Sequence, residues 1–273
     1  MNLFICLYMR NRFKDKIVIV TGAGSGIGQR TAERFSEEGA QVVIAELDKN
    51  TGKQVEKKIN NNNGKAIFIE TDVAEYNSVQ EMVKNTVKEF GSPDILINNA
   101  GINVFSEPLK MSESEWKRAF SVDLDGVWNG CKAVLPHMLE KAKGSIVNIS
   151  SVHGFQIIPN CFPYPVAKHG VIGLTRALAV DYASKGIKIN CISPGYTDTP
   201  ILERFFSTKP DPEKARKEAE FRQPIRRMGT TTEIANTILF MSSDECNYMI
   251  GANIVVDGGI TLKIHENDDT GAN

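Results

Sequence analysis

The stretch "KIVIVTGAGSGIGQRTAERF" (residues 16–35) passes from an apolar segment through a glycine cluster into an amphipathic segment. The apolar part predicts a buried strand, and the residues that follow the glycines predict a helix. The spacing is Gly22, Gly26 and Gly28, so the common G-x-G-x-x-G pattern is not met. Glycines at such a turn let the backbone approach a pyrophosphate, which sits at the helix N-terminus. This turn is therefore a candidate dinucleotide site, although alone it is weak evidence.

Six further apolar runs follow the first along the chain. Most are rich in Ile and Val and nearly continuous, as is typical of strands covered on both faces. Longer amphipathic stretches separate them; in 75–90 the apolar side chains recur every three or four residues. Ser112 and Glu115 have the spacing of a helix capping box. The seven runs are 16–22, 41–46, 66–72, 95–101, 145–150, 187–195 and 253–259.

This alternation predicts an α/β fold: a single-domain, Rossmann-like, doubly wound parallel sheet of seven strands with helices on both faces. We find no linker and no internal repeat, so we expect one domain over 14–262. An N-terminal extension (1–13) precedes it and a polar C-terminal tail (263–273) follows it. Within the domain, 200–228 predicts two short helices over the ligand crevice, a candidate substrate lid.

The composition is that of an ordinary soluble protein, with 41% apolar and 24% charged residues and a formal net charge of −1. This balance gives no basic field for nucleic acid or anionic lipid, so neither is an expected partner. The apolar N-terminal run is too short to span a bilayer. Five scattered cysteines indicate reduced thiols and a cytoplasmic location. Four dispersed histidines form no metal-ligand pattern, and we expect no metal.

Chemically informative residues stand at the ends of the predicted strands. In doubly wound sheets, ligands bind beyond the carboxyl ends of the strands. Six loops therefore converge on one crevice. After the glycines, the strand ends are followed by Glu46, Asp72, Asn98–Gly101, Ser150–Ser151 and Pro194–Gly195.

Glu46 bears on the choice between NAD and NADP. A carboxylate at the end of the second strand can accept both ribose hydroxyls and repels a 2′-phosphate. The glycine loop itself contains no arginine or lysine. We therefore favour NAD(H). The alternative is that Glu46 is a solvated acid and that Lys49 or Arg30 hosts the phosphate of NADP.

Tyr164 and Lys168 lie four residues apart and would share one helix face. Pro165 suits the first turn of that helix, where its missing N–H costs nothing. A positive charge at ~4 Å, with an effective dielectric of ~20, contributes ~4 kcal/mol toward the phenolate, roughly three pKa units before desolvation opposes it. Such a phenol could act as a general acid and base near neutral pH, with Ser151 holding the substrate oxygen.

The complete set of motifs resembles the classical short-chain dehydrogenase/reductase family over residues 14–262. It comprises T-G-x-x-x-G-x-G (21–28), N-N-A-G (98–101), Ser151, Tyr164-x-x-x-Lys168 and Pro194–Gly195 in this order. The resemblance implies NAD(P)-dependent hydride transfer, with Ser151, Tyr164 and Lys168 catalytic. It also implies a homotetramer built through helices around 115–140 and 164–184. The implied cofactor contacts are Gly22, Ser25, Gly26, Ile27, Gly28, Glu46, Asp72, Val73, Asn99, Ala100, Gly101, Tyr164, Lys168, Pro194, Gly195, Thr197 and Thr199.

One position departs from the family pattern. "FSVDLDG" (120–126) aligns with V-N-L-x-G, so Asp123 stands where a catalytic asparagine is usual. We hypothesise that Asp123 is a functional substitute whose negative charge favours the charged form of Lys168. The alternative is a tolerated exchange in which the backbone carbonyl does the work.

The predicted substrate side mixes polar and aromatic residues. The candidate substrate contacts are Ser151, His153, Tyr164 and Asn103, and we expect His153 to be a wall more than a second acid. Other expected pocket residues are Gln156, Asn160, Cys161, Phe155 and Phe162, with the lid phenylalanines Phe205 and Phe206. Arg204, Arg222, Arg226 or Arg227 could pair a substrate carboxylate, against the default of solvated lid charges.

In detail these segments resemble family members that oxidise sugars or sugar acids, which implies a polyhydroxylated substrate. The first alternative is an NADPH-dependent 3-oxoacyl-thioester (acyl carrier protein) reductase, which Glu46 argues against. The second, from another class, is a non-catalytic dinucleotide-binding sensor. Such sensors usually lack the tyrosine–lysine pair, which this chain keeps.

Overall fold

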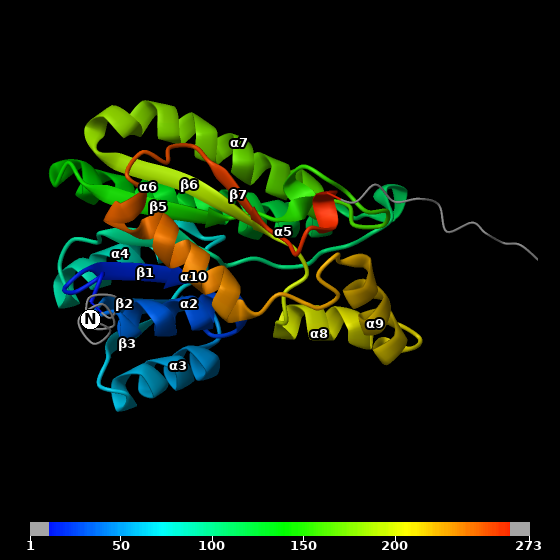
Figure 1. Ribbon diagram of the computed structural model, residues 1–273. Helices are drawn as coiled ribbons and strands as arrows, with labels where there is room; N and C mark the ends of the chain where they lie inside the picture. Colours follow the sequence, from blue (N-terminus) through cyan, green and yellow to red (C-terminus); the bar gives the residue numbers. More distant parts are fainter. Residues whose placement is uncertain (1–10, 263–273) are drawn as a thin grey trace, which may run out of the picture.

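Seven parallel strands form the central sheet of the computed structural model, which describes residues 11–262 (Figure 1). The strand order is β3-β2-β1-β4-β5-β6-β7, as expected for a doubly wound sheet. The order reverses between β1 and β4, which places the ligand crevice beyond their carboxyl ends. The strands are β1 Ile17–Thr21, β2 Gln41–Glu46, β3 Lys65–Glu70, β4 Ile95–Asn98, β5 Gly144–Ile149, β6 Ile187–Pro194 and β7 Asn253–Val256.

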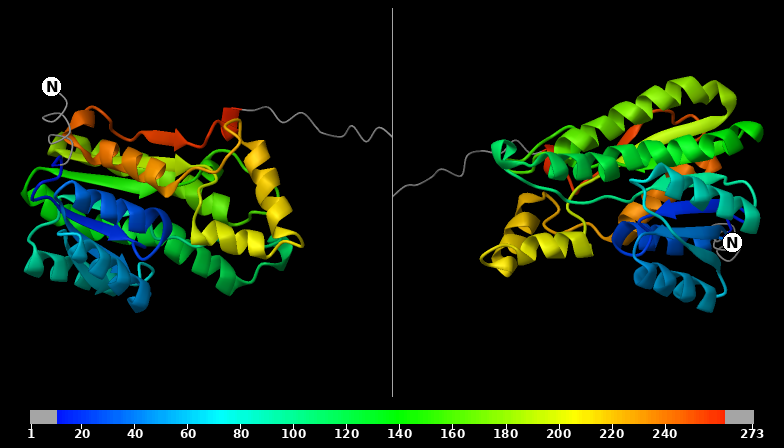
Figure 2. Two further views of the ribbon diagram at one scale, coloured as in Figure 1. Left: turned by 60° about the horizontal axis from the view of Figure 1, so that its bottom comes forward. Right: turned by 180° about the vertical axis from the view of Figure 1, so that it is seen from behind.

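Helices cover both faces of this sheet (Figures 1 and 2). One layer contains α2 (Gly26–Glu37), α3 (Lys49–Asn61) and α10 (Thr231–Ser242). The other contains α4 (Tyr76–Glu89), α6 (Gly126–Glu140) and α7 (Tyr164–Tyr182). The remaining helices are α5 (Glu113–Phe120), the π-helical turn η2 (Ser121–Asp125), α8 (Pro200–Ser207), α9 (Pro212–Arg222) and the short 3₁₀ turns η1 (Pro108–Lys110), η3 (Val152–Gly154), η4 (Ala183–Lys185), η5 (Asp244–Cys246) and η6 (Ile260–Leu262). The predicted seven-stranded, doubly wound fold is confirmed.

The apolar runs are nearly continuous because the central strands are buried on both faces. Val18 and Val20 of β1 pack with Phe35 of α2 in one core cluster. Ile19, between them, packs with Met82 of α4 in the other. Each such side chain contributes about 1.5–3 kcal/mol of burial free energy relative to an exposed position.

Two residues of the predicted N-terminal extension, Arg12 and Phe13, pack against the rest of the described chain. Phe13 is 2% exposed and meets the Phe35 ring edge-to-face at 4.7 Å. Arg12 forms an ion pair with the buried carboxylate of Glu38, with Nε and Oε2 2.5 Å apart. Residues 12 and 13 therefore pack against the helix α2 end of the body, whereas residues 1–10 of the predicted extension lie outside the described residues. The tail predicted over 263–273 lies outside the described residues.

Helices α8 and α9 fill most of the segment predicted as two short helices over the crevice. They stand beyond the carboxyl ends of the strands, apart from the two helix layers (Figures 1 and 2). A backbone bridge between Thr197 and Gly229 closes the base of this segment. The Gly229 N–H donates to Tyr196 O at 2.9 Å, and the Asp198 N–H donates to Gly229 O at 2.9 Å. We call this bridge the neck.

Two smaller predictions can be checked directly. The capping box of Ser112 and Glu115 is present at the start of α5. Four of the five cysteines lie in the described part of the chain and are free and buried, whereas Cys6 lies outside it. Over residues 11–262, the longest and most apolar helices still fall short of what a bilayer crossing requires.

Candidate active site

A cavity of about 570 Å³ opens at the carboxyl ends of the strands. It is bounded by the loops after β1 to β6 and by α8. Two predicted site residues, Gly28 and Asp123, do not line it and are buried behind its wall. The predicted residues that do line it are Gly22, Ser25, Gly26, Ile27, Glu46, Asp72, Val73, Asn99, Ala100, Gly101, Asn103, Ser151, His153, Tyr164, Lys168, Pro194, Gly195, Thr197 and Thr199.

The glycine turn fits a pyrophosphate. Gly22 and Gly26 have φ of 62° and 56°, in the left-handed region that favours glycine. Ser25 is the N-cap of α2 but makes no side-chain capping bond, and the first turn of α2 carries no acidic residue. The N–H groups in the first turn of α2 therefore create a positive potential at the cavity, which favours the binding of a phosphate.

Asn99 holds the glycine turn in place. Its Nδ2 donates to Thr21 O at 2.9 Å and to Gly22 O at 3.0 Å. The Thr21 hydroxyl accepts the N–H groups of Asn99 at 3.0 Å and Ala100 at 3.1 Å. The N-N-A-G segment thus joins the ends of β1 and β4 by hydrogen bonds, at the place where the strand order reverses.

Glu46 lies at the end of the cavity where an adenosine ribose would sit. Its Oε2 accepts the Gly24 N–H at 2.9 Å, and its Oε1 accepts the N–H groups of Leu47 and Asp48 at 2.8 and 3.1 Å. These backbone bonds fix the carboxylate at the rim. Arg30, the alternative phosphate host, instead forms ion pairs with Glu33 and Glu37 and does not line the cavity.

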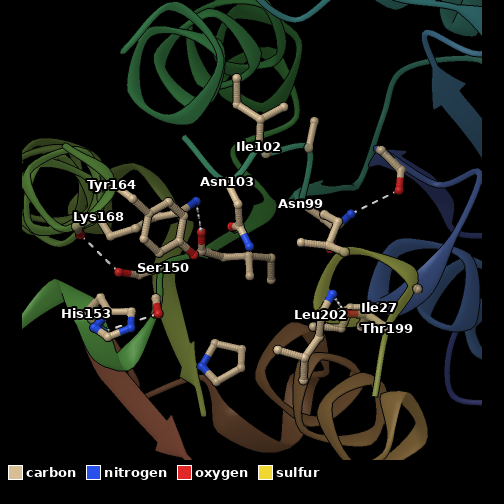
Figure 3. Close-up of a pocket in the computed structure, with 18 of the residues that line it drawn as sticks. Ile27, Asn99, Ile102, Asn103, Ser150, His153, Tyr164, Lys168, Thr199 and Leu202 are labelled. Atoms are coloured by element: carbon tan, nitrogen blue, oxygen red, sulfur yellow. Dashed lines mark hydrogen bonds between the residues drawn. The ribbon is translucent and has the colours of Figure 1, made fainter. Parts of the chain in front are cut away.

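Tyr164 and Lys168 face the cavity from the first turns of α7 (Figure 3). The helix begins at Tyr164 between two prolines, as the sequence predicts. Lys168 Nζ lies 5.4 Å from the Tyr164 ring centre and donates to Ile149 O at 3.2 Å. The Ser150 hydroxyl donates to Lys168 O at 2.9 Å, which ties the end of β5 to α7.

The ionisation of Tyr164 differs from the sequence-based expectation. Burial raises the pKa of the phenol above its usual value, and this effect outweighs the opposing charge of Lys168. The carboxyl of Asp123 also raises the pKa of Tyr164, whereas hydrogen bonding by Ser151 lowers it. Without a further positive charge the phenol is therefore a proton donor at neutral pH.

Asp123 lies in the η2 turn, directly behind Lys168. Its Oδ1 accepts the Ile102 N–H at 2.9 Å and is 3.8 Å from Lys168 Nζ. Its Oδ2 is buried and has no hydrogen-bond partner among the described residues. Burial raises the pKa of this carboxyl, against the opposing effects of Lys168 and the Ile102 N–H.

Two aromatic residues flank the phenol on the substrate side. Phe105 meets Tyr164 edge-to-face at 5.8 Å and meets Phe205 of α8 in the same way at 5.8 Å. The loop that carries Phe105 is held by a backbone bridge to Pro163. The His153 ring lies 6.1 Å from the Tyr164 ring, and burial lowers the pKa of His153. A neutral His153 fits the expected wall.

Several expected pocket residues lie elsewhere. Phe155 and Asn160 do not line the cavity, and Phe162 stacks on Trp116 at 5.7 Å. Phe206 is buried within the segment 200–228, where it packs with Ala219 and Met228. Of the four candidate arginines in this segment, only Arg204 lines the cavity. Arg226 covers the Phe221 ring, and Arg227 pairs with Glu233.

Sequence reasoning also missed part of the wall. The missed lining residues include Ile102, Phe105, Arg118, Ile157, Ile158, Tyr196 and Leu202. Phe105 could have been suspected, since it follows the N-N-A-G segment by only four residues. The others depend on loop paths that have no local sequence signal. Together they make the substrate side more apolar than expected.

Comparisons with known proteins match this architecture. A family model described as "Enoyl-(Acyl carrier protein) reductase" matches residues 22–261. The 3-oxoacyl-[acyl-carrier-protein] reductase FabG of Thermotoga maritima is 37% identical, over 92% of this chain and 100% of that protein. The cis-4-hydroxycyclohexanecarboxylate dehydrogenase of Sinomonas cyclohexanicum is 38% identical, over 93% and 99%. The ligand-free structure of Thermoplasma acidophilum aldohexose dehydrogenase superposes with a TM-score of 0.84 at 35% identity, over 93% and 97%.

Proposed function

The chain belongs to the classical short-chain dehydrogenase/reductase family, and from that premise we propose that it is an NAD(H)-dependent dehydrogenase of a cyclic secondary alcohol, with Tyr164 as acid and base. As a member of this family it binds NAD(P) and acts on alcohols and carbonyls. The observation that carries the proposal is the convergence of Ser151, Tyr164 and Lys168 on the cavity that also holds the glycine turn and Glu46.

Each residue of the triad has a distinct task. The Ser151 hydroxyl accepts the His153 N–H at 3.2 Å, which leaves its own proton free to donate to the substrate oxygen. Tyr164 takes the alcohol proton during oxidation and returns it during reduction. When bound, oxidised NAD supplies the hydride acceptor and a second positive charge near the phenol. Lys168 contributes the first positive charge, and the two charges together favour the phenolate that alcohol oxidation needs.

The preference for NAD(H) is supported by the rim of the cavity. Glu46 places a fixed negative charge where the 2′-phosphate of NADP would lie. Lys49, like Arg30, does not line the cavity. The same features count against the 3-oxoacyl-thioester reductase alternative, which normally uses NADPH, although the Thermotoga relative carries that name.

Two substrate classes fit this proposal. A sugar or sugar-acid derivative is supported by the polar Asn103, His153 and Gln156 in the cavity wall and by the aldohexose dehydrogenase relative. A carbocyclic alcohol or hydroxy acid is favoured by the apolar Phe105 and Phe205, which pack against each other in the cavity wall, and by the cyclohexane relative. We further propose that 200–228 acts as the substrate lid.

The deciding experiment is a screen for NAD-dependent absorbance change with sugars, sugar acids, cycloalkanols and acyclic alcohols, run in parallel with NADP. Tyr164→Phe serves as the blank and should lose about 10²- to 10⁴-fold in turnover. A blank as fast as the parent would overturn the assignment of Tyr164. NADH binding without turnover of any alcohol would instead support the sensor alternative.

We also propose a homotetramer built through the helices around 115–140 and 164–184. Large apolar side chains exposed on α6 and α7 support it: Trp128 is 39%, Val166 44% and Val180 78% exposed. Helix faces with such side chains are common association surfaces. Sedimentation equilibrium would test this, and a monomer at micromolar concentration would contradict it. A cytoplasmic location remains a prediction.

A further inference from the structure

The side chain of Asp123 is fully buried, yet it makes only one hydrogen bond within the described residues. That bond, to the Ile102 N–H, anchors the loop after β4. The second carboxylate oxygen has no partner among them. Leaving a buried polar atom unpaired costs free energy of folding, so packing alone does not explain why a carboxylate occupies position 123.

Lys168 is the charge that faces this carboxyl. Its ammonium is buried with Asp123, and the two groups are 3.8 Å apart. This distance is too long for a good hydrogen bond but short for two charges. The Lys168 ammonium lies between Asp123 Oδ1 and Ile149 O, to which it donates. Asp123 Oδ1 and Ile149 O thus fix the position of the Lys168 ammonium relative to Tyr164.

Gly101 leaves the space that this arrangement needs. A Cβ at Gly101 would lie 2.9 Å from Asp123 Oδ1 and 3.5 Å from Lys168 Nζ. Among the described residues, the ionisable groups that act on this carboxyl or on the phenol beside it are Lys168 and Tyr164 of α7 and the Cys161 thiol. The carboxyl, the ammonium and the phenol therefore form one electrostatic cluster.

We propose that Asp123 is a positioning residue that acts through Lys168, holding the ammonium beside the phenol and setting alcohol oxidation to a higher pH range than an uncharged side chain would. The inference rests on the proposed function of Tyr164. A negative charge disfavours the phenolate, and oxidation requires the phenolate to take up the alcohol proton. Removing the charge leaves Lys168 without its buried counter-charge. Tyr164 then ionises at lower pH.

The test is a titration of Tyr164 by ultraviolet difference absorbance of phenolate, with NAD present. Each protein is measured against the same protein carrying Tyr164→Phe, so that the other tyrosines cancel. Asp123→Asn preserves the shape of the side chain and the acceptor for Ile102. It should lower the titration midpoint of Tyr164 by roughly one to two pH units. The rise of kcat/KM with pH should move by the same amount.

Asp125→Asn is the matched control. It removes the same charge from the same turn, but Asp125 is exposed, so the midpoint should not move. Asp123→Ser, smaller and uncharged, replaces the amide variant if thermal unfolding shows that the latter does not fold. A purely structural role predicts a lower melting temperature with an unmoved midpoint.

The possible results separate the two proposals. An unchanged or raised midpoint in the Asp123 variant overturns this inference. If the midpoint falls but no alcohol is turned over, Asp123 does set the ionisation of Tyr164, but the effect on alcohol oxidation and the proposed function both fail. If alcohols are oxidised and the midpoints coincide, the proposed function stands and Asp123 is a tolerated exchange.

Discussion

Substitution of Gly28 would test whether the glycine turn binds the pyrophosphate, because Gly28 packs directly against the Gly22 carbonyl of that turn. A Cβ at this position would lie 2.2 Å from Gly22 O and 2.4 Å from Asn99 Nδ2, whereas ordinary Cβ contacts begin at 3.4 Å. The carbonyl belongs to the backbone, and the amide is held by its bonds to Thr21 O and Gly22 O. In Gly28→Ala both groups must therefore retreat by about 1 Å.

Overpacking of this size costs about 1–3 kcal/mol of stability. A displacement of ~1 Å in a binding element costs on the order of 100-fold, or about 2.7 kcal/mol. We therefore expect Gly28→Ala to raise the Kd for NADH about 100-fold, measured by fluorescence titration, and to lower the melting temperature.

Gly173→Ala is the matched control, because a Cβ at Gly173 in α7 has nothing within 4 Å. Alanine in a helix interior should add about 0.5–1 kcal/mol of stability and leave the Kd unchanged. Wild-type NADH affinity in Gly28→Ala would refute the assignment of the glycine turn as the pyrophosphate seat.

Two further predictions concern charge. Glu46→Ser removes the negative charge at the ribose end and should raise the ratio of kcat/KM for NADP over NAD at least about tenfold; an unchanged ratio would show that Glu46 does not select the cofactor. The hydrogen bond with Arg227 is the main reason why the pKa of Glu233 is lowered to about 2. This carboxylate therefore stabilises the fold fully above its unfolded pKa of ~4.3, and the stabilisation is lost as pH falls toward 2. Glu233→Gln should therefore cost no more than about 1 kcal/mol at pH 7, given its exposure, and nothing at pH 2, and melting curves that differ equally at both pH values would contradict this.

The architecture, and the meeting of the glycine turn with Tyr164 at one cavity, could be predicted because their signals are local. Strands buried on both faces must be nearly continuous in Ile and Val, and parallel strands deliver their carboxyl ends to one edge. The turn from Gly22 to Gly28 and the helix start at Tyr164 follow from glycine and proline geometry. The positions of these residues along the chain were therefore enough to predict that they meet at one cavity.

The substrate side could not be predicted, because its side chains are placed by tertiary contacts. Phe162 is an expected pocket residue but packs against Trp116 outside the cavity lining, while Phe105 is held near the cavity by a backbone bridge to Pro163. The ionisation of Tyr164 could not be predicted for the same reason. Its charge partner is visible in the sequence, but the extent of its burial is not.

The neck between Thr197 and Gly229 has a consequence for how this scaffold can diversify. Since the backbone already joins both ends of the intervening segment, lengthening or shortening it changes loop-closure entropy only slowly. Helices α8 and α9 form a separate small core around Phe206 and share little with the sheet. We therefore expect α8 and α9 to tolerate changes of length, so that the substrates open to this chain can vary there while the sheet keeps its shape.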